Sequence, residues 1–438
     1  MLLAGHDKGR RQRLLRLGMD QRSLPPRIVL GSTALVWLLG LSQIVGYGTM
    51  YYSVSILAAD IADGLGWPVA WLWGSFSLAL LAGGLVAPLV GQRIDRHGAG
   101  LVMAVGSGLS ALTLLAAAMA PNAIVFSIAL VAMQAASAMV FYDAAFAALV
   151  QATGSQAGLR ITHLTLIAGF ASTISWPLTS WLQGVLGWRE ILMAFALANV
   201  AVCLPIHAVI ATQRRRLFAA SAVVPADELP VVDEVTVPAA LHRPVLWLVT
   251  IGFALSGFAL SAMLTEMVPM LTALGLGGSA LVVSMLFGPA QVLVRFVNML
   301  IGLRRHPMLA TLIGLGMLPL AILLLMASAP LTLGAVAFAA LLGFGSGLKS
   351  IVQGTLPLAL FGSASYGARL GYMAMARQGL AAVAPFVLAV LVDSAGPRWA
   401  LLAIATAAAL GLAAMVAVAR INRRPTEQKG ANQMSGAE

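Results

Sequence analysis

The sequence has very few charged residues. Only 9% of its 438 residues are Asp, Glu, Lys or Arg, whereas soluble domains carry about 25%. Hydrophobic residues make up 60% of the chain, and its mean hydropathy is +0.93. So few charges do not cover the surface of a water-soluble fold, and the composition therefore excludes a soluble globular protein. We expect lipid to be the solvent for most of the chain.

Cysteine and catalytic patterns are equally scarce. The single cysteine, Cys203, lies in an apolar segment, which excludes a disulfide framework and a multi-thiolate metal site. The phosphate-binding pattern G-x-x-x-x-G-K-[ST] does not occur, so the sequence does not predict an ATP-driven pump. The apolar segments also lack the clustered His, Asp and Glu residues of a membrane enzyme. We expect no catalytic activity, no metal and no cofactor.

Long apolar runs are what the sequence has instead. Backbone groups in hydrocarbon must pair with one another, so spanning segments are helices or closed barrels, and runs of about 20 residues favour helices. The sequence predicts an all-α membrane protein with twelve spans. Their expected ranges are 28–57, 68–90, 99–119, 123–149, 161–186, 191–211, 243–271, 279–303, 308–327, 331–360, 370–392 and 400–420.

Basic residues give the expected topology. The net charge of +11 comes from residues in short loops and near the ends of the chain. This distribution follows the positive-inside rule, places both termini in the cytoplasm and argues against a nucleic-acid partner. A polar, proline-containing stretch separates two blocks of six spans, which is typical of duplicated transporters with a substrate site between their halves. The predicted organisation is a basic tail (1–27), a first bundle (28–211), a linker (212–242), a second bundle (243–420) and a C-terminal tail (421–438).

A cluster of charge interrupts the apolar sequence between the second and third spans. Residues 91–100 read GQRIDRHGAG, and we expect the stretch to form a short loop whose tight turn needs glycine. At this position in a twelve-span chain, the pattern G-x-x-x-D-R-x-G resembles the signature of the major facilitator superfamily. The matching residues are Gly91, Asp95, Arg96 and Gly98.

The resemblance extends over residues 28–420 and implies two pseudo-symmetric six-helix bundles that rock about a central site. It implies a monomeric secondary transporter, with protons as the expected coupling ion. It also implies that Asp95 latches the halves by facing the N-terminal end of span 11, near residues 369–372, where a helix favours a carboxylate. Family members often have a basic residue where this chain has Ala99, so this chain lacks the charged side chain for a relay through that position. The alternative is that the basic residues of the cluster only mark topology.

Ionisable side chains inside the spans are functional candidates, because hydrocarbon penalises them. Asp143 of span 4 is expected to belong to the gate, through an ion pair with Arg96 or Arg160. Glu266 of span 7 is the expected site of proton coupling, since burial favours its protonated form. The alternative for Glu266 is a solvated carboxylate at the outer mouth.

Polar and cationic side chains share helix faces in the second half. Gln291, Arg295 and Asn298 follow i, i+4, i+7 spacing in span 8, and Lys349 and Gln353 are four residues apart in span 10. No acid lies at a similar depth in that half, so the two cations predict an anion-binding patch. The alternatives are that Arg295 binds helix-end carbonyls and that Lys349 reaches the cytoplasmic interface.

The first half offers aromatic and polar side chains for the same cavity. Gln43 and Tyr47 lie on one face of span 1, and Ser172 and Trp176 lie on one face of span 5. Trp176 is near mid-span, which is too deep for an interfacial belt residue. We expect these residues to bind the substrate, a small organic anion, opposite the cations of the second half.

Two further resemblances bear on the substrate. The cationic patch with Arg295 in span 8 is similar to that of carriers of monocarboxylates and oxalate. The stretches VFYDAAFAALVQ (140–151) and ITHLTLIAGFASTISWPLTSWLQ (161–183) are similar to a bacterial branch that includes efflux permeases for trivalent arsenic compounds. The implied location is the inner membrane of a bacterium. Efflux of arsenic compounds or drugs is the alternative function, and a non-transporting membrane sensor is the third.

Overall fold

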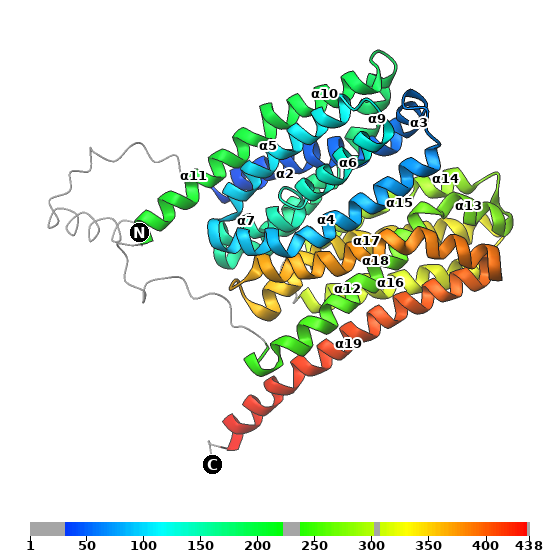
Figure 1. Cartoon of the computed structure of the whole chain (residues 1–438). Helices are drawn as coiled ribbons and strands as arrows, with labels where there is room; N and C mark the ends of the chain where they lie inside the picture. Colours follow the sequence, from blue (N-terminus) through cyan, green and yellow to red (C-terminus); the bar gives the residue numbers. More distant parts are fainter. Residues whose placement is uncertain (1–30, 222–236, 302–306, 436–438) are drawn as a thin grey trace, which may run out of the picture.

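The structure is a computed structural model that describes residues 31–221, 237–301 and 307–435. Over these residues the elements are helices, with no strand (Figure 1). Eleven helical stretches are long and apolar enough to cross a membrane. One of them, Ala123–Gln183, contains two spans, and the shorter helix Met267–Leu276 continues the span that precedes it. The prediction of a twelve-helix membrane protein is confirmed.

The first half contains spans 1 to 6. Span 1 consists of α2 (Ser32–Tyr47), the π-helical turn η2 (Gly48–Tyr52) and α3 (Ser53–Gly64). Spans 2 and 3 are α4 (Val69–His97) and α5 (Ala99–Ala118). Span 4 consists of α6 (Ala123–Ser137) and α7 (Tyr142–Thr153), and span 5 of α8 (Ala157–Ala168) and α9 (Ala171–Gln183). Span 6 consists of α10 (Trp188–Ala198), η4 (Asn199–Cys203) and α11 (Leu204–Ser221).

The second half contains spans 7 to 12. Span 7 consists of α12 (His242–Thr265), α13 (Met267–Leu271) and η7 (Thr272–Leu276), and span 8 of α14 (Ala280–Met285) and α15 (Phe287–Ile301). Spans 9 to 12 are α16 (Pro307–Ser328), α17 (Thr332–Phe361), α18 (Tyr366–Ala395) and α19 (Pro397–Ser435). The first half (blue to green) and the second half (green to red) lie side by side as two layers (Figure 1).

The charge cluster at residues 91–100 is not the loop that the sequence predicted. Helix α4 continues to His97 and α5 begins at Ala99, so Gly98 alone makes the turn. The φ angle of Gly98 is 94°, in the region that glycine adopts without strain. The side chains of the motif therefore project in fixed directions from the last turns of α4.

Several other limits differ from the predicted ones. Helix α3 ends at Gly64, α11 extends into the predicted linker as far as Ser221, and α19 extends through the predicted C-terminal tail as far as Ser435. The predicted basic tail (1–27) lies outside the described residues, as does part of the predicted linker (222–236).

Two spans of the first half are interrupted near their middle. Span 4 is broken at residues 138–141 and span 5 at residues 169–170. A break frees backbone groups that water cannot reach, and polar side chains must then bind them. Gln43 Nε2 donates to the Val140 carbonyl (2.7 Å) at the first break. This contact gives Gln43 a structural part in the bundle.

The two halves pack against each other at one end of the molecule. The helix pairs that pack extensively across the halves are α4 with α18, α8 with α17, α8 with α15 and α7 with α18. At this end, Tyr366 and Leu370 of α18 are buried in a hydrophobic cluster with first-half residues such as Leu149. We call it the Asp95 end, after the motif acid. Helices α6 and α9, which form the other parts of spans 4 and 5, pack on helices of their own half.

Candidate functional site: the interface between the two halves

Asp95 connects the two halves through its carboxylate. The two oxygens accept hydrogen bonds from the backbone N–H groups of Gly367 (2.9 Å) and Ala368 (2.8 Å) in the first turn of α18. These N–H groups have no partner within their own helix, and the helix dipole favours a negative charge there. The contact lies at residues 367–368, slightly before the expected 369–372. Asp95 thus caps a helix of the opposite half.

Glycines allow α4 and α18 to approach to backbone contact. A side-chain carbon on Gly91 would collide with the carbonyl of Gly367, and one on Gly371 would collide with the carbonyl of Ala87. A carbon on Gly367 would lie 2.8 Å from Asp95 Oδ1. Close approach therefore explains the first glycine of the motif, whereas Gly98 is explained by its φ angle.

A glutamine that the sequence analysis did not select fixes the turn after Asp95. Gln151 of α7 donates from Nε2 to the Ile94 carbonyl (3.2 Å) and accepts through Oε1 from the N–H of Ala99 (2.9 Å). Ala99 occupies the position where family members often have a basic side chain, and it takes part in this turn through its backbone N–H group. Arg96 is exposed at this end.

Asp143 forms an ion pair across the halves. Arg377 Nη2, on α18, lies 3.0 Å from Asp143 Oδ2, at the start of α7. The predicted partners Arg96 and Arg160 are therefore wrong, and Arg160 donates instead to the side chain of Gln156 (3.1 Å). Residue spacing in the sequence does not reveal which second-half helix faces span 4. Arg377 was therefore not predicted to belong to the site.

Two further cations of the second half are buried. Arg295 of α15 is 4% exposed, and its Nη1 donates to the Thr165 carbonyl (3.1 Å) beside the break in span 5. Its Nε has no hydrogen-bond partner. Lys349 of α17 is 5% exposed, and within the described structure its ammonium makes no hydrogen bond or ion pair. Arg295 therefore does bind a helix-end carbonyl, whereas the Lys349 side chain is buried and does not extend to the cytoplasmic surface.

Lys349 and Arg377 lie against the same glycine of α12. A side-chain carbon on Gly257 would be 3.4 Å from Lys349 Nζ and 3.1 Å from Arg377 Cγ. The Lys349 ammonium is thus buried beside the aliphatic part of the Arg377 side chain. Such an arrangement is costly unless an anion compensates it.

Aromatic side chains of the first half form a wall. The rings of Tyr47 and Phe141 are stacked with their centroids 4.0 Å apart, and Tyr142 lies 5.1 Å from Tyr47. Trp176 contacts Tyr52 edge-on at 5.9 Å. These residues come from spans 1, 4 and 5, and Phe141 and Tyr142 lie at the end of the break in span 4.

This aromatic wall faces the cations. Tyr142 makes a side-chain contact with Arg295, with Tyr52 nearby, and Tyr47 lines one cavity together with Asp143 and Arg377. Phenol hydroxyls and guanidinium N–H groups are hydrogen-bond donors for an anion. We define the central site as Tyr47, Tyr52, Tyr142, Asp143, Arg295, Lys349 and Arg377.

The other predicted binding residues lie in different surroundings. Ser172 is half-buried and forms a side-chain contact with Tyr52. Gln291 donates to Ser346 Oγ (2.7 Å) within the second half, and Gln353 is half-buried in α17. Asn298 lines a separate cavity between the helices of span 8 and its neighbours.

Glu266 lies at the kink between α12 and α13. Its backbone leaves helical geometry there, with φ −105° and ψ 14°. The side chain is half-buried, and in the described part of the chain its carboxylate has no hydrogen bond. The structure brings Glu266 into contact with none of the residues of the central site.

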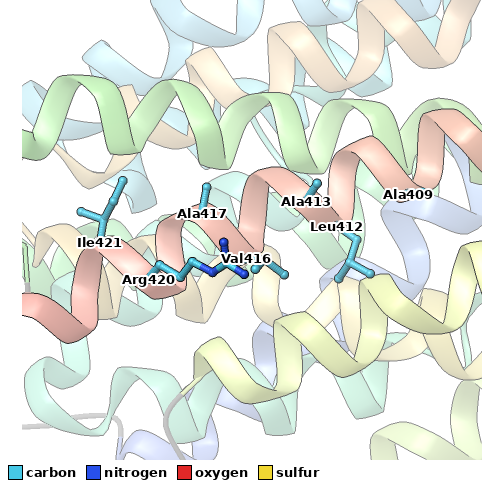
Figure 2. A pocket seen from close by; sticks show the side chains of 7 residues that line it. All are labelled: Ala409, Leu412, Ala413, Val416, Ala417, Arg420 and Ile421. Atoms are coloured by element: carbon cyan, nitrogen blue, oxygen red, sulfur yellow. The ribbon is translucent and has the colours of Figure 1, made fainter.

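Three cavities differ in position. One of about 40 Å³ lies between the halves and is lined by Tyr47, Asp143 and Arg377, among others. One of about 550 Å³, mainly aliphatic, lies between α8 of the first half and helices α15, α16 and α17. A groove of about 510 Å³ follows α19 from Ala409 to Ile421 (Figure 2). The first of these belongs to the central site. No group of metal-ligating side chains occurs among the described residues.

The fold and the interface define a multi-pass membrane protein of the transporter type, with two six-helix halves and a charged centre. The chain belongs to the Major Facilitator Superfamily, whose family model matches residues 38–348. A search of curated protein sequences finds no match.

Solved structures support the same assignment. The proton:xylose symporter XylE is 12% identical with a TM-score of 0.66, and covers 88% of this chain and 96% of its own. The human organic anion transporter MFSD10 is 16% identical with a TM-score of 0.64, at 90% and 100% coverage. FucP in the outward conformation is 15% identical with a TM-score of 0.62, at 87% and 98% coverage. At these identities the likeness shows the fold.

Proposed function

We propose that this protein is a secondary active transporter of small organic anions. The observation that carries the proposal is the charge of the central site, where Arg295, Lys349 and Arg377 are accompanied by one carboxylate, that of Asp143. Positive charge that is not compensated in a region of low dielectric constant favours a bound anion. A carboxylate is well suited to the site, because it accepts hydrogen bonds from guanidinium, ammonium and phenol groups together.

The aromatic wall supports a substrate that carries an organic body. Tyr47 lines one cavity with Arg377 and packs on Tyr142, while Trp176 contacts Tyr52 edge-on. Aromatic side chains of this kind contribute apolar contact area as well as hydroxyl donors. Efflux of arsenic compounds has less support, because Cys203, the thiol of the chain, is buried inside the first half with Sγ 3.7 Å from the Ser42 carbonyl.

Transport would proceed by alternating access, with the Asp95 end in the cytoplasm of a bacterial cell and the protein acting as a monomer. The contacts of Asp95 with α18 hold the halves together at that end, so this conformation would be the outward-facing one. We infer proton coupling, with Glu266 as the proposed proton site; its half-buried carboxylate supports this role. XylE is a proton symporter and MFSD10 an organic anion transporter, which agrees with both parts of the proposal.

Replacement of Lys349 by methionine tests the substrate class. The buried ammonium has no partner in the described structure, so its loss should leave the apparent unfolding temperature of the ligand-free protein unchanged or higher. A bound anion should stabilise the wild type by about 2.7 kcal/mol at a concentration of 100 Kd. Loss of one charge-assisted hydrogen bond should weaken anion binding by about 10-fold to 100-fold. The measurement is thermal unfolding with oxalate, pyruvate, benzoate or arsenite.

Arg398→Met serves as the matched control, because Arg398 is exposed and lies outside the central site. This variant should be stabilised by carboxylates as the wild type is. Stabilisation of the wild type and of Lys349→Met by arsenite alone would replace the organic-anion proposal with the efflux alternative.

A further inference from the structure

Asp143 is already bound to a guanidinium group, that of Arg377, which an anionic substrate would need. Its Oδ2 lies 3.0 Å from Arg377 Nη2, and no other acid belongs to the central site as defined above. The pair is not sealed in the interior, since the side chain of Arg377 is 18% exposed and that of Asp143 is 23% exposed. A carboxylate of the protein therefore sits on a cation that remains accessible for exchange.

Lys349 lies close to this ion pair and could make a second contact with an anion. The free volume beside the pair is small. Lys349 lies beside Arg377 along Gly257 and has no hydrogen bond or ion pair in the described structure. The adjoining cavity, which both members of the pair line, has a volume of about 40 Å³. That is roughly the volume of one or two water molecules. With so little space beside Arg377, a substrate carboxylate and the Asp143 side chain compete for the same place.

We propose that Asp143 is an internal competitor of the substrate, which exchanges with a substrate carboxylate on Arg377. This inference rests on the proposed function and names the mode of binding at the same site. The incoming carboxylate takes over the hydrogen bond to Arg377 and gains a second contact with Lys349. Asp143 then remains beside Tyr47, which lines the same cavity. One carboxylate replaces another, so the guanidinium keeps an anionic partner throughout.

The exchange links binding to the conformation of the two halves. Asp143 comes from α7 of the first half and Arg377 from α18 of the second. The substrate therefore breaks an ion pair that crosses the interface, while the contacts of Asp95 with α18 stay in place. A ligand changes a conformational equilibrium only through contacts that differ between the states. This ion pair is such a contact.

The test compares the affinity of purified, full-length variants for the carboxylate that stabilises the wild type most among oxalate, pyruvate and benzoate. Asp143→Asn keeps the side-chain shape but removes the competing charge. We expect it to bind that carboxylate about fivefold or more tightly, because the fraction of protein with a free Arg377 rises. Asp60→Asn is the control, since Asp60 accepts from Gln183 (2.7 Å) away from the central site. Its affinity should equal that of the wild type.

The variants Arg377→Gln and Asp143→Asn/Arg377→Gln keep the inference testable if Asp143→Asn alone does not fold. The double variant leaves no unpaired charge from the ion pair, and both variants should bind the carboxylate at least about tenfold more weakly than the wild type. A merely structural ion pair predicts instead that the double variant binds as the wild type does.

The outcomes separate the two proposals. If the wild type binds a carboxylate but Asp143→Asn binds it equally or more weakly, or the double variant keeps full affinity, internal competition is wrong and the organic-anion function stands. If the wild type binds none of the three carboxylates, the proposed function itself fails, and the competition inference fails with it.

Discussion

Gly371→Ala is expected to force the halves apart at the Asp95 end. The added carbon would collide with the backbone carbonyl of Ala87, which has no freedom to rotate away. Overpacking of this kind costs about 1–3 kcal/mol, which corresponds to a change of about 5-fold to 150-fold in the ratio of closed to open molecules. The measurement is the distance distribution between spin labels at His97 and Ala364. Both positions are exposed, one on each half, and Cys203 is replaced by alanine to remove the native thiol.

Gly379→Ala is the matched control on the same helix. A carbon on Gly379 would lie 3.9 Å from Leu81 Cδ1, an ordinary van der Waals contact. Both substitutions raise the helix propensity of α18 by about 1 kcal/mol, so a difference between them reports packing alone. An unchanged distance distribution in Gly371→Ala would show that contact between α4 and α18 does not hold the halves together.

Asp95→Asn is expected to weaken the closed Asp95 end by a different route. The amide still accepts from one N–H of α18, but its NH₂ group then faces the other donor, and the charge that the helix dipole favours is lost. A loss of about 2 kcal/mol, typical of one hydrogen bond to a charged group, would change the closed-to-open ratio by about 30-fold. The same pair of spin labels should show a longer distance in this variant.

Asp63→Asn makes the same chemical change at an exposed acid of span 1, outside the motif. Its distance distribution should match that of the parent protein. A closed end that persists in Asp95→Asn would show that Asp95 is not part of the gate and would leave only the topological role of the basic residues in the cluster.

The fold was predictable because it follows from hydropathy. Apolar runs, turn residues and the placement of basic residues are local features, and the twelve spans are present in the structure. The predicted loop at residues 91–100 was wrong for a physical reason. Charged side chains at a helix end reach water while the backbone remains helical, so the charge cluster forms the last turns of α4 and not a loop after it.

The central site was only partly predictable. Residue type identified Arg295 and Lys349, because cations in hydrocarbon are rare in any span. The partners of those cations depend on which helices face each other across the halves, and this information is not in the spacing of one chain. The breaks in spans 4 and 5 also escaped prediction, although Gly169 at the second break leaves the space that Arg295 Nη1 fills. Tyr52, Tyr142 and Arg377 could have been found from the rule that a polar group within a span needs a partner.

Uptake of labelled oxalate and pyruvate into vesicles that contain the purified protein tests the central claim most directly. An inward proton gradient is imposed, and the wild type is compared with Lys349→Met, Arg398→Met and protein-free vesicles. We predict saturable uptake by the wild type and Arg398→Met, and uptake at least about tenfold lower with Lys349→Met, since one charge-assisted contact is lost. Uptake by the wild type that does not exceed that of protein-free vesicles, or equal uptake by Lys349→Met, would contradict an organic-anion transporter with a cationic central site.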